Sequence, residues 1–128
     1  MEIGIKNKLE MVVQDSDTAR IIGSGTLDVL ATPRLAELVE QCCYLSVSPF
    51  LKENESTVGA KIDLNHLSAT PVGLKVVCTS ELVEIDNRKL VFSFSVNDEA
   101  GLIATGTHIR YIIDVKRFLI KANSKNNV

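Results

Sequence analysis

Three residues of this chain carry side chains that could act together in catalysis: the hydroxyl of Thr32, the carboxylate of Glu40 and the imidazole of His66. In acid–base and nucleophilic catalysis, a hydroxyl or carboxylate attacks or activates water while an imidazole transfers protons. Such groups beside a partly apolar surface suit acyl transfer. Each residue also has a simpler structural explanation, which depends on the element that carries it.

Thr32 and Glu40 lie in a segment, residues 32–51, whose apolar side chains follow a helical period. Thr32 is a suitable N-cap, and Pro33 is a suitable first helical residue. At about 100° per residue, two adjacent apolar stripes are made by Leu35, Leu38, Val39 and Cys42 and by Ala36, Cys43 and Val47. Glu40 falls on the second stripe, where an unpaired charge is costly. Alternatively, Glu40 lies at the edge of the stripe and reaches water or a structural partner, and Thr32 only caps the helix.

His66 ends a predicted strand. From Val58 onward, apolar and polar residues alternate, and His66 continues the apolar row 58, 60, 62 and 64. Its ordinary alternative role is that of a core histidine with satisfied hydrogen bonds. Because Thr32 and Glu40 are a little over two helical turns apart, both could face one end of a groove that His66 completes. His108 ranks second, since it could instead bridge strands or line an interface between subunits.

The rest of the chain is predicted to form a sheet. The predicted strands cover residues 3–13, 58–66, 74–85, 90–96 and 102–115. Short turns join the last three into an antiparallel meander. Residues 14–20 are predicted to be turns, 21–26 a flexible loop and 121–128 a frayed tail. A helix this apolar must be covered by its own sheet, so we expect an α+β hotdog fold, in which an antiparallel sheet wraps around one long central helix.

Composition narrows the class of protein. A chain of 128 residues, 45% hydrophobic and 23% charged, is predicted to form one globular domain over residues 1–128. The net charge of −2 and the lack of a basic stripe with interleaved aromatics argue against a nucleic-acid partner. No apolar run reaches the ~18 residues of a membrane span, and the N-terminus lacks a signal-peptide pattern. We therefore expect a cytoplasmic protein without a membrane partner.

The three cysteines, Cys42, Cys43 and Cys78, do not have the spacing of metal ligands. Adjacent cysteines on a helix point about 100° apart and do not readily share a tetrahedral site. We expect buried, reduced thiols, with a reactive thiol as the alternative. No metal site is predicted.

Several short motifs resemble the fluoroacetyl-CoA thioesterase family of hotdog proteins. They are Leu30-Ala31-Thr32-Pro33, Leu38-Val39-Glu40, Val58-Gly59, Asn65-His66 with Ala69-Thr70-Pro71-Val72-Gly73, and Gly106-Thr107-His108. Their order and spacing match the family over roughly residues 5–120. The resemblance implies an acyl-CoA thioesterase that acts as a homodimer, with two subunits paired edge to edge so that an exposed edge strand is covered.

The resemblance also implies roles for single residues. The family's catalytic threonine, glutamate and histidine fall on Thr32, Glu40 and His66. Gly59 matches a glycine near the thioester carbonyl, whose backbone N–H could donate to the oxyanion. Whether Glu40 or an activated water attacks stays open. Coenzyme A is part of the substrate, and no separate cofactor is implied.

The sequence gives no firm guide to the residues that bind the CoA phosphates. The candidates, chosen only because they are basic, are Arg34, Lys75, Lys116 and Arg117. The fluoroacetyl enzyme also has a longer, phenylalanine-bearing lid before the helix, whereas residues 20–29 here are short and contain no phenylalanine. We therefore expect a short- or medium-chain acyl group rather than fluoroacetyl selectivity.

Two other hotdog functions are compatible with the sequence. One is a non-catalytic module that binds an acyl-CoA as a sensor or carrier. The other is a hydratase-like protein, which is disfavoured because no Asp-x-x-x-x-His pair occurs on the helix side. Hydrolysis of a thioester by the purified protein would distinguish an enzyme from a non-catalytic binding module.

Overall fold

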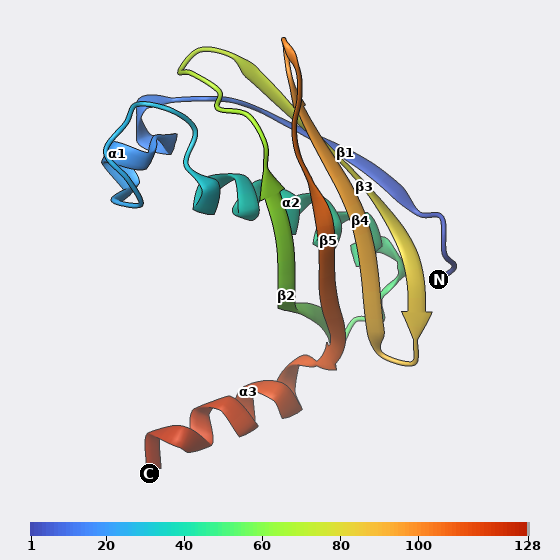
Figure 1. Ribbon diagram of the computed structural model, residues 1–128. Helices are drawn as coiled ribbons and strands as arrows, with labels where there is room; N and C mark the ends of the chain where they lie inside the picture. The colour runs from blue at the N-terminus through green and yellow to red at the C-terminus, as the bar shows by residue number, and fades with distance from the viewer. Residues whose placement is uncertain (128) are drawn as a thin grey trace.

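A computed structural model describes residues 1–127 and contains an antiparallel sheet that curves around one long helix (Figure 1). The strands are β1 (Lys6–Val12), β2 (Glu55–His66), β3 (Lys75–Asp86), β4 (Lys89–Asp98) and β5 (Gly101–Asp114). The helices are α1 (Ala19–Ile22), α2 (Thr32–Val47) and α3 (Val115–Asn123), with 3₁₀ turns at Asp15–Asp17, Ser48–Phe50 and Ser124–Asn127. The predicted α+β architecture is confirmed.

The strand order in the sheet is β1-β3-β4-β5-β2, and all neighbouring strands are antiparallel. Strands β3, β4 and β5 form the predicted meander. The β3–β4 turn closes between Asp86 and Lys89, where Asn87 adopts a φ of 58°. Asparagine tolerates this left-handed conformation better than most residues. Strand β2 precedes the meander in the chain but lies at the far edge of the sheet, so its outer side has no partner strand among residues 1–127.

Helix α2 fills the concave face of the sheet. Its buried residues are Leu35, Leu38, Val39, Cys42, Cys43, Ser46 and Val47. They include both predicted apolar stripes except for Ala36, which is partly exposed. Each fully buried Leu or Val stabilises the fold by about 1.5–3 kcal/mol relative to exposure. All three cysteines are free and buried, as predicted.

The two ends of α2 differ from the prediction. Ala31 occupies the N-cap position, and Thr32 is already the first helical residue, so the prediction that Thr32 caps the helix is wrong. Its hydroxyl is therefore available for another partner. The helix ends at Val47 instead of continuing to Leu51, because Pro49 lacks an N–H and its ring clashes with the carbonyl four residues earlier.

Strand β2 contains a β-bulge that the alternating pattern did not predict. Gly59 pairs with Arg110 and Lys61 with Ile109, which leaves Ala60 as the extra residue. A bulge shifts the alternation by one position. The row 62, 64 and 66 therefore keeps its predicted face, but Thr57 and Gly59 face the helix in place of Val58 and Ala60.

Both termini contain structure that differs from the predictions. Strand β1 starts at Lys6 rather than at residue 3. The turn region 14–22 contains a 3₁₀ turn and α1, and most of the predicted frayed tail is helical. Asp114 caps α3 by accepting a hydrogen bond from the Arg117 N–H at 3.0 Å. The last residue of that predicted tail, Val128, lies outside the described residues.

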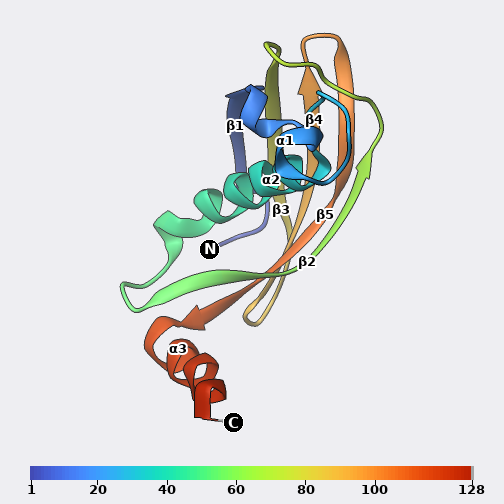
Figure 2. The same ribbon diagram turned by 90° about the vertical axis from the view of Figure 1, so that its left-hand side faces the viewer.

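Helix α3 projects away from the sheet at the end of β5 (Figure 2). None of its residues is buried. No helix within residues 1–127 is long and apolar enough to cross a membrane.

Candidate functional site

Thr32 and His66 are in direct contact. Thr32 Oγ1 lies 2.8 Å from His66 Nδ1, so a hydrogen bond joins the first residue of α2 to the last residue of β2. His66 Nε2 is buried and has no hydrogen-bond partner within residues 1–127. A buried polar atom without a partner costs about 1–3 kcal/mol, so this nitrogen is well suited to bind a reacting group. The positive end of the α2 dipole also favours negative charge at this position.

Glu40 belongs to a second group, which surrounds Gly59 on β2. A Cβ atom at Gly59 would lie 3.2 Å from Glu40 Oε2, 3.2 Å from Arg110 Nη1 and 3.4 Å from His108 Cε1. Glu40, Arg110 and His108 thus converge on the backbone of a residue that has no side chain. The bulge at Ala60 explains this placement, because it turns Gly59 toward the helix.

Arg110 was not among the predicted site residues. Its side chain is only 7% exposed. Nε donates to Thr57 Oγ1 at 2.9 Å, Nη2 donates to the Thr57 carbonyl at 3.0 Å, and the guanidinium lies 5.6 Å from the centre of the Tyr44 ring. Burial lowers the pKa of Arg110, and the negative charge of Glu40 opposes that shift. A buried cation needs a counter-charge, and Glu40 is placed to supply it.

A sequence signal for Arg110 did exist. Residues two apart on a strand share one face, and His108 was already expected to lie near the site or an interface. An arginine two positions after His108 therefore points to the same side of the sheet. Basic residues considered singly, without their place on a strand, give no such indication.

His108 bridges two strands, which is one of the roles considered for it. It is 1% exposed, and Nδ1–H donates to the Lys61 carbonyl at 2.7 Å. Nε2 lies 3.2 Å from Arg110 Nη1 and accepts from it. These contacts suit a neutral imidazole with its proton on Nδ1. Burial lowers the pKa of His108, and the Lys61 hydrogen bond opposes that shift.

We expect acid to destabilise the fold below the ordinary histidine pKa of about 6.5. Because the pKa of His108 is lowered in the folded state, the unfolded chain takes up this proton first as the pH falls. Urea unfolding from about pH 7.5 to 5.5 should show a falling free energy of unfolding, by up to about 1.4 kcal/mol per pH unit for one proton. A His108→Gln variant should lose that part of the slope, and an equal slope in both proteins would contradict the prediction.

Cys42 also titrates in that pH range, because its hydrogen bond with Cys78 lowers the thiol pKa to about 7, and it does so in both proteins. The two shifted carboxyl groups do not act there. The carboxyl pKa values of Asp98 and Asp114 are lowered from 3.8, chiefly by hydrogen bonds from the Thr70 hydroxyl and the Arg117 N–H. They contribute to pH-dependent stability only under more acidic conditions.

The two groups lie apart within one chain. Residues 59 and 66 are seven positions apart on β2, about 23 Å at 3.3 Å per residue. Residues 32 and 40 are eight positions apart on α2, about 12 Å at 1.5 Å per residue. The structure therefore joins Thr32 to His66 and Glu40 to Gly59, but it does not bring the three predicted catalytic residues together in a single chain.

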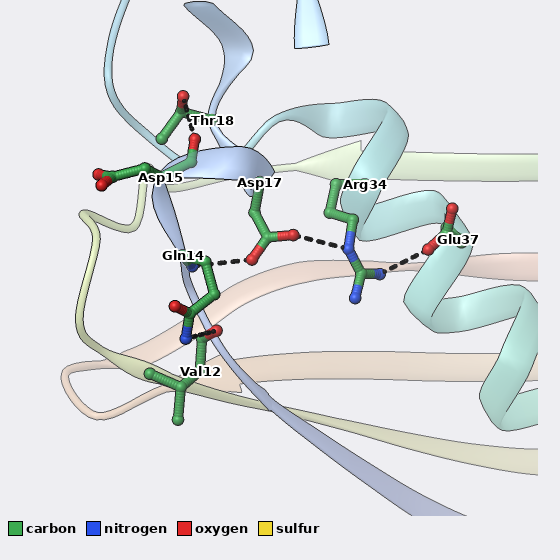
Figure 3. Close-up of polar contacts among 7 residues, drawn as sticks. All are labelled: Val12, Gln14, Asp15, Asp17, Thr18, Arg34 and Glu37. Carbon is green, nitrogen blue, oxygen red and sulfur yellow. Dashed lines mark hydrogen bonds and ion pairs between the residues drawn. The ribbon is translucent and has the colours of Figure 1, made fainter. Parts of the chain in front are cut away.

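Arg34 is held in ion pairs (Figure 3). Its Nε lies 2.9 Å from Asp17 Oδ1, and its Nη1 lies 3.1 Å from Glu37 Oε1. Asp17 also accepts a hydrogen bond from the Gln14 N–H at 2.8 Å, so it is fixed within its 3₁₀ turn while its pair with Arg34 joins that turn to the start of α2. These contacts give Arg34 a structural role, and its predicted role in substrate binding stays a prediction.

Comparisons with known proteins agree on one family. A family model described as fluoroacetyl-CoA-specific thioesterase matches residues 13–116. The fluoroacetyl-CoA thioesterase of Streptantibioticus cattleyicolor is 35% identical over 98 residues, which cover 77% of this chain and 70% of that protein. A solved structure of a fluoroacetyl-CoA thioesterase aligns with a TM-score of 0.92 and 30% identity, over 98% of this chain and 97% of the other.

A more distant similarity concerns the fold alone. A hot-dog-like protein from Thermanaerovibrio acidaminovorans aligns with a TM-score of 0.90 and 19% identity, over 98% of this chain and 93% of the other. Together with the sheet wrapped around α2, this match confirms the predicted hotdog fold.

Proposed function

Because this chain belongs to the fluoroacetyl-CoA thioesterase family, we propose that it hydrolyses an acyl-CoA thioester to the free acid and coenzyme A. The structural observation that carries the proposal is the hydrogen bond from Thr32 to His66 Nδ1, which leaves Nε2 of the ring unpaired. A hydroxyl–imidazole pair with a free ring nitrogen at a helix N-terminus suits proton transfer beside a polarised carbonyl. A mutant fluoroacetyl-CoA thioesterase has been solved with fluoroacetate and CoA.

The proposed reaction uses both groups of residues. Glu40 attacks the thioester carbonyl carbon, or it removes a proton from the water that attacks. The Gly59 N–H donates to the oxyanion that forms. The C–S bond then breaks, and His66, held by Thr32, supplies the proton that the leaving CoA sulfur takes up. Where Glu40 itself attacks, water hydrolyses the mixed anhydride that forms, which releases the acid and regenerates the carboxylate. In both routes the proton that water loses restores the protonated His66. Arg110 and His108 lie beside Glu40 at Gly59, where the positive charge of Arg110 attracts the carboxylate.

We also propose that the catalytic site is completed by dimerisation. The two groups lie toward opposite ends of β2, whose outer edge has no partner strand in the described part of the chain. An antiparallel β2–β2 pair about a two-fold axis at Asp63 would place Gly59 opposite the partner's His66, because the bulge at Ala60 shifts the register by one residue. Glu40 and Gly59 of one subunit would then meet the Thr32–His66 pair of the other. The same pairing would cover two exposed edges.

A panel of thioesters tests the activity. Purified protein should release free thiol from acetyl-, butyryl-, hexanoyl- or octanoyl-CoA, without a preference for fluoroacetyl-CoA. The expected substrate range follows from residues 20–29, which contain the exposed Ile21, Ile22 and Leu27 but no phenylalanine. Tight CoA binding without thiol release would contradict the enzyme and favour the non-catalytic binding module.

A further inference from the structure

Besides the catalytic groups, the molecule has an open cleft between α3 and the end of β5. Its volume is about 410 Å³, within the range of roughly 300–1,000 Å³ that is usual for small-molecule sites. Three cations line it, from the β3–β4 turn and from α3: Arg88, Arg117 and Lys121. Phe118, Ile112 and Asp114 complete most of the lining. We propose that this cleft binds the phosphate-bearing nucleotide part of coenzyme A, an inference that rests on the proposed function.

The charge in the cleft favours an anion. Among residues 1–127, Asp114 is the one carboxylate that lines the cleft. Both of its oxygens are already engaged, by the Arg117 N–H at 3.0 Å and by Asn54 Nδ2 at 2.8 Å. Arg88 donates from Nη1 to the Ile112 carbonyl at 3.2 Å. None of the three cations forms an ion pair within residues 1–127. Their remaining N–H groups can therefore bind phosphate oxygens.

The position of the cleft fits the length of the substrate. Arg110, which touches the Glu40–Gly59 group, and Asp114, which lines the cleft, lie on the same strand and the same face of β5. Four residues of extended strand separate them by about 13 Å. CoA joins its thioester to its phosphates through the linear pantetheine arm, which can cross this span when extended. The ring of Phe118 is 40% exposed and offers a face on which a purine can stack.

The test compares two thioesters that carry the same acyl group. One is the acyl-CoA, and the other is the acyl-N-acetylcysteamine thioester, which has the same reacting bond but no phosphate. Arg117→Gln and Lys121→Gln should each raise KM for the acyl-CoA roughly three- to fivefold, as expected for the loss of one exposed charge contact. The kcat value and the kinetics with the truncated thioester should stay unchanged. Added salt should raise KM only for the acyl-CoA.

Lys116→Gln is the matched control, because Lys116 lies on the same helix but does not line the cleft. The glutamine variants keep the backbone N–H groups of α3, so the Asp114 cap is preserved. An unchanged KM for acyl-CoA in both variants would overturn the proposal. An equal loss with both thioesters, or an equal rise in KM in Lys116→Gln, would also overturn it.

A binding measurement separates this inference from the proposed function. If the wild-type protein hydrolyses no thioester, calorimetric titration with adenosine 3′,5′-bisphosphate still tests the cleft. Binding that Arg117→Gln and Lys121→Gln weaken, and that Lys116→Gln leaves intact, would support the nucleotide site without catalysis. Equal affinity for inorganic phosphate and for the nucleotide would reduce the cleft to a simple anion site and overturn the CoA assignment.

Discussion

Glu40→Gln should lower kcat/KM for acyl-CoA hydrolysis by about 10²–10⁴-fold, the usual contribution of a catalytic acid–base group. The amide has nearly the same shape as the carboxylate, but it can neither remove a proton from water nor attack a carbonyl. Thiol release from the best substrate of the panel measures the effect. Glu37→Gln is the matched control, since Glu37 lies on the same helix, one turn earlier, on the exposed face.

The same substitution should also affect stability, because Arg110 loses the charge that faces it. Glu40 and Arg110 form no direct ion pair within residues 1–127 and Glu40 is partly exposed, so we expect a loss of about 1 kcal/mol rather than the roughly 3–5 kcal/mol of a broken buried pair. Activity must therefore be compared well below the unfolding midpoint of each protein. Full activity in a folded Glu40→Gln variant would be compatible with a thioesterase, but it would show that Glu40 is not one of its catalytic residues.

Mixing two inactive variants tests whether the site is shared between subunits. If Glu40 works with the partner's His66, then refolding Glu40→Gln together with His66→Ala yields mixed dimers with one intact site. Random pairing should restore about a quarter of the wild-type sites. Each variant alone should stay inactive, and no recovery in the mixture would contradict the shared site.

Gly106→Ala should be severely destabilising, by about 3 kcal/mol or more. A Cβ atom there would overlap the carbonyl oxygen of Asp63 and come within 2.7 Å of Phe94 Cζ. Gly106 pairs with Leu64 on β2 and with Phe94 on β4, so strand β2 would have to move away from β5. Chemical denaturation followed by circular dichroism measures the loss in unfolding free energy.

Gly25→Ala provides the control for adding one methyl group. Its Cβ would meet only the Ala19 Cβ at 3.3 Å, and Gly25 lies in an exposed loop. We expect a change within about 0.5–1 kcal/mol. If both substitutions lowered the free energy of unfolding by a similar amount, close packing of β2 against β5 would not explain the need for glycine at position 106.

The sequence by itself determined the central helix and the meander, because both depend on local periodicity. A period near 3.6 identifies α2 and its buried stripes, and a period of 2 identifies β3, β4 and β5. It also marked Glu40 as a charge on an apolar stripe and His66 as a polar residue at the end of an apolar row. Helix α3 (Val115–Asn123) was missed because residues 116–120 are too few to show a helical period and residues 121–123 were assigned to a polar tail.

Only the tertiary structure decided how these residues are grouped. The edge position of β2 brings His66 to Thr32, and a hydroxyl that local rules assign to a cap bonds an imidazole instead. The bulge at Ala60 turns Gly59 toward Glu40 and Arg110, which reverses the face that alternation predicts. Strand order and bulges depend on pairing between residues far apart in the chain, and local periodicity carries no information about that pairing. For this reason the sequence could name the three proposed catalytic residues but could not show that one chain holds them as two separate groups.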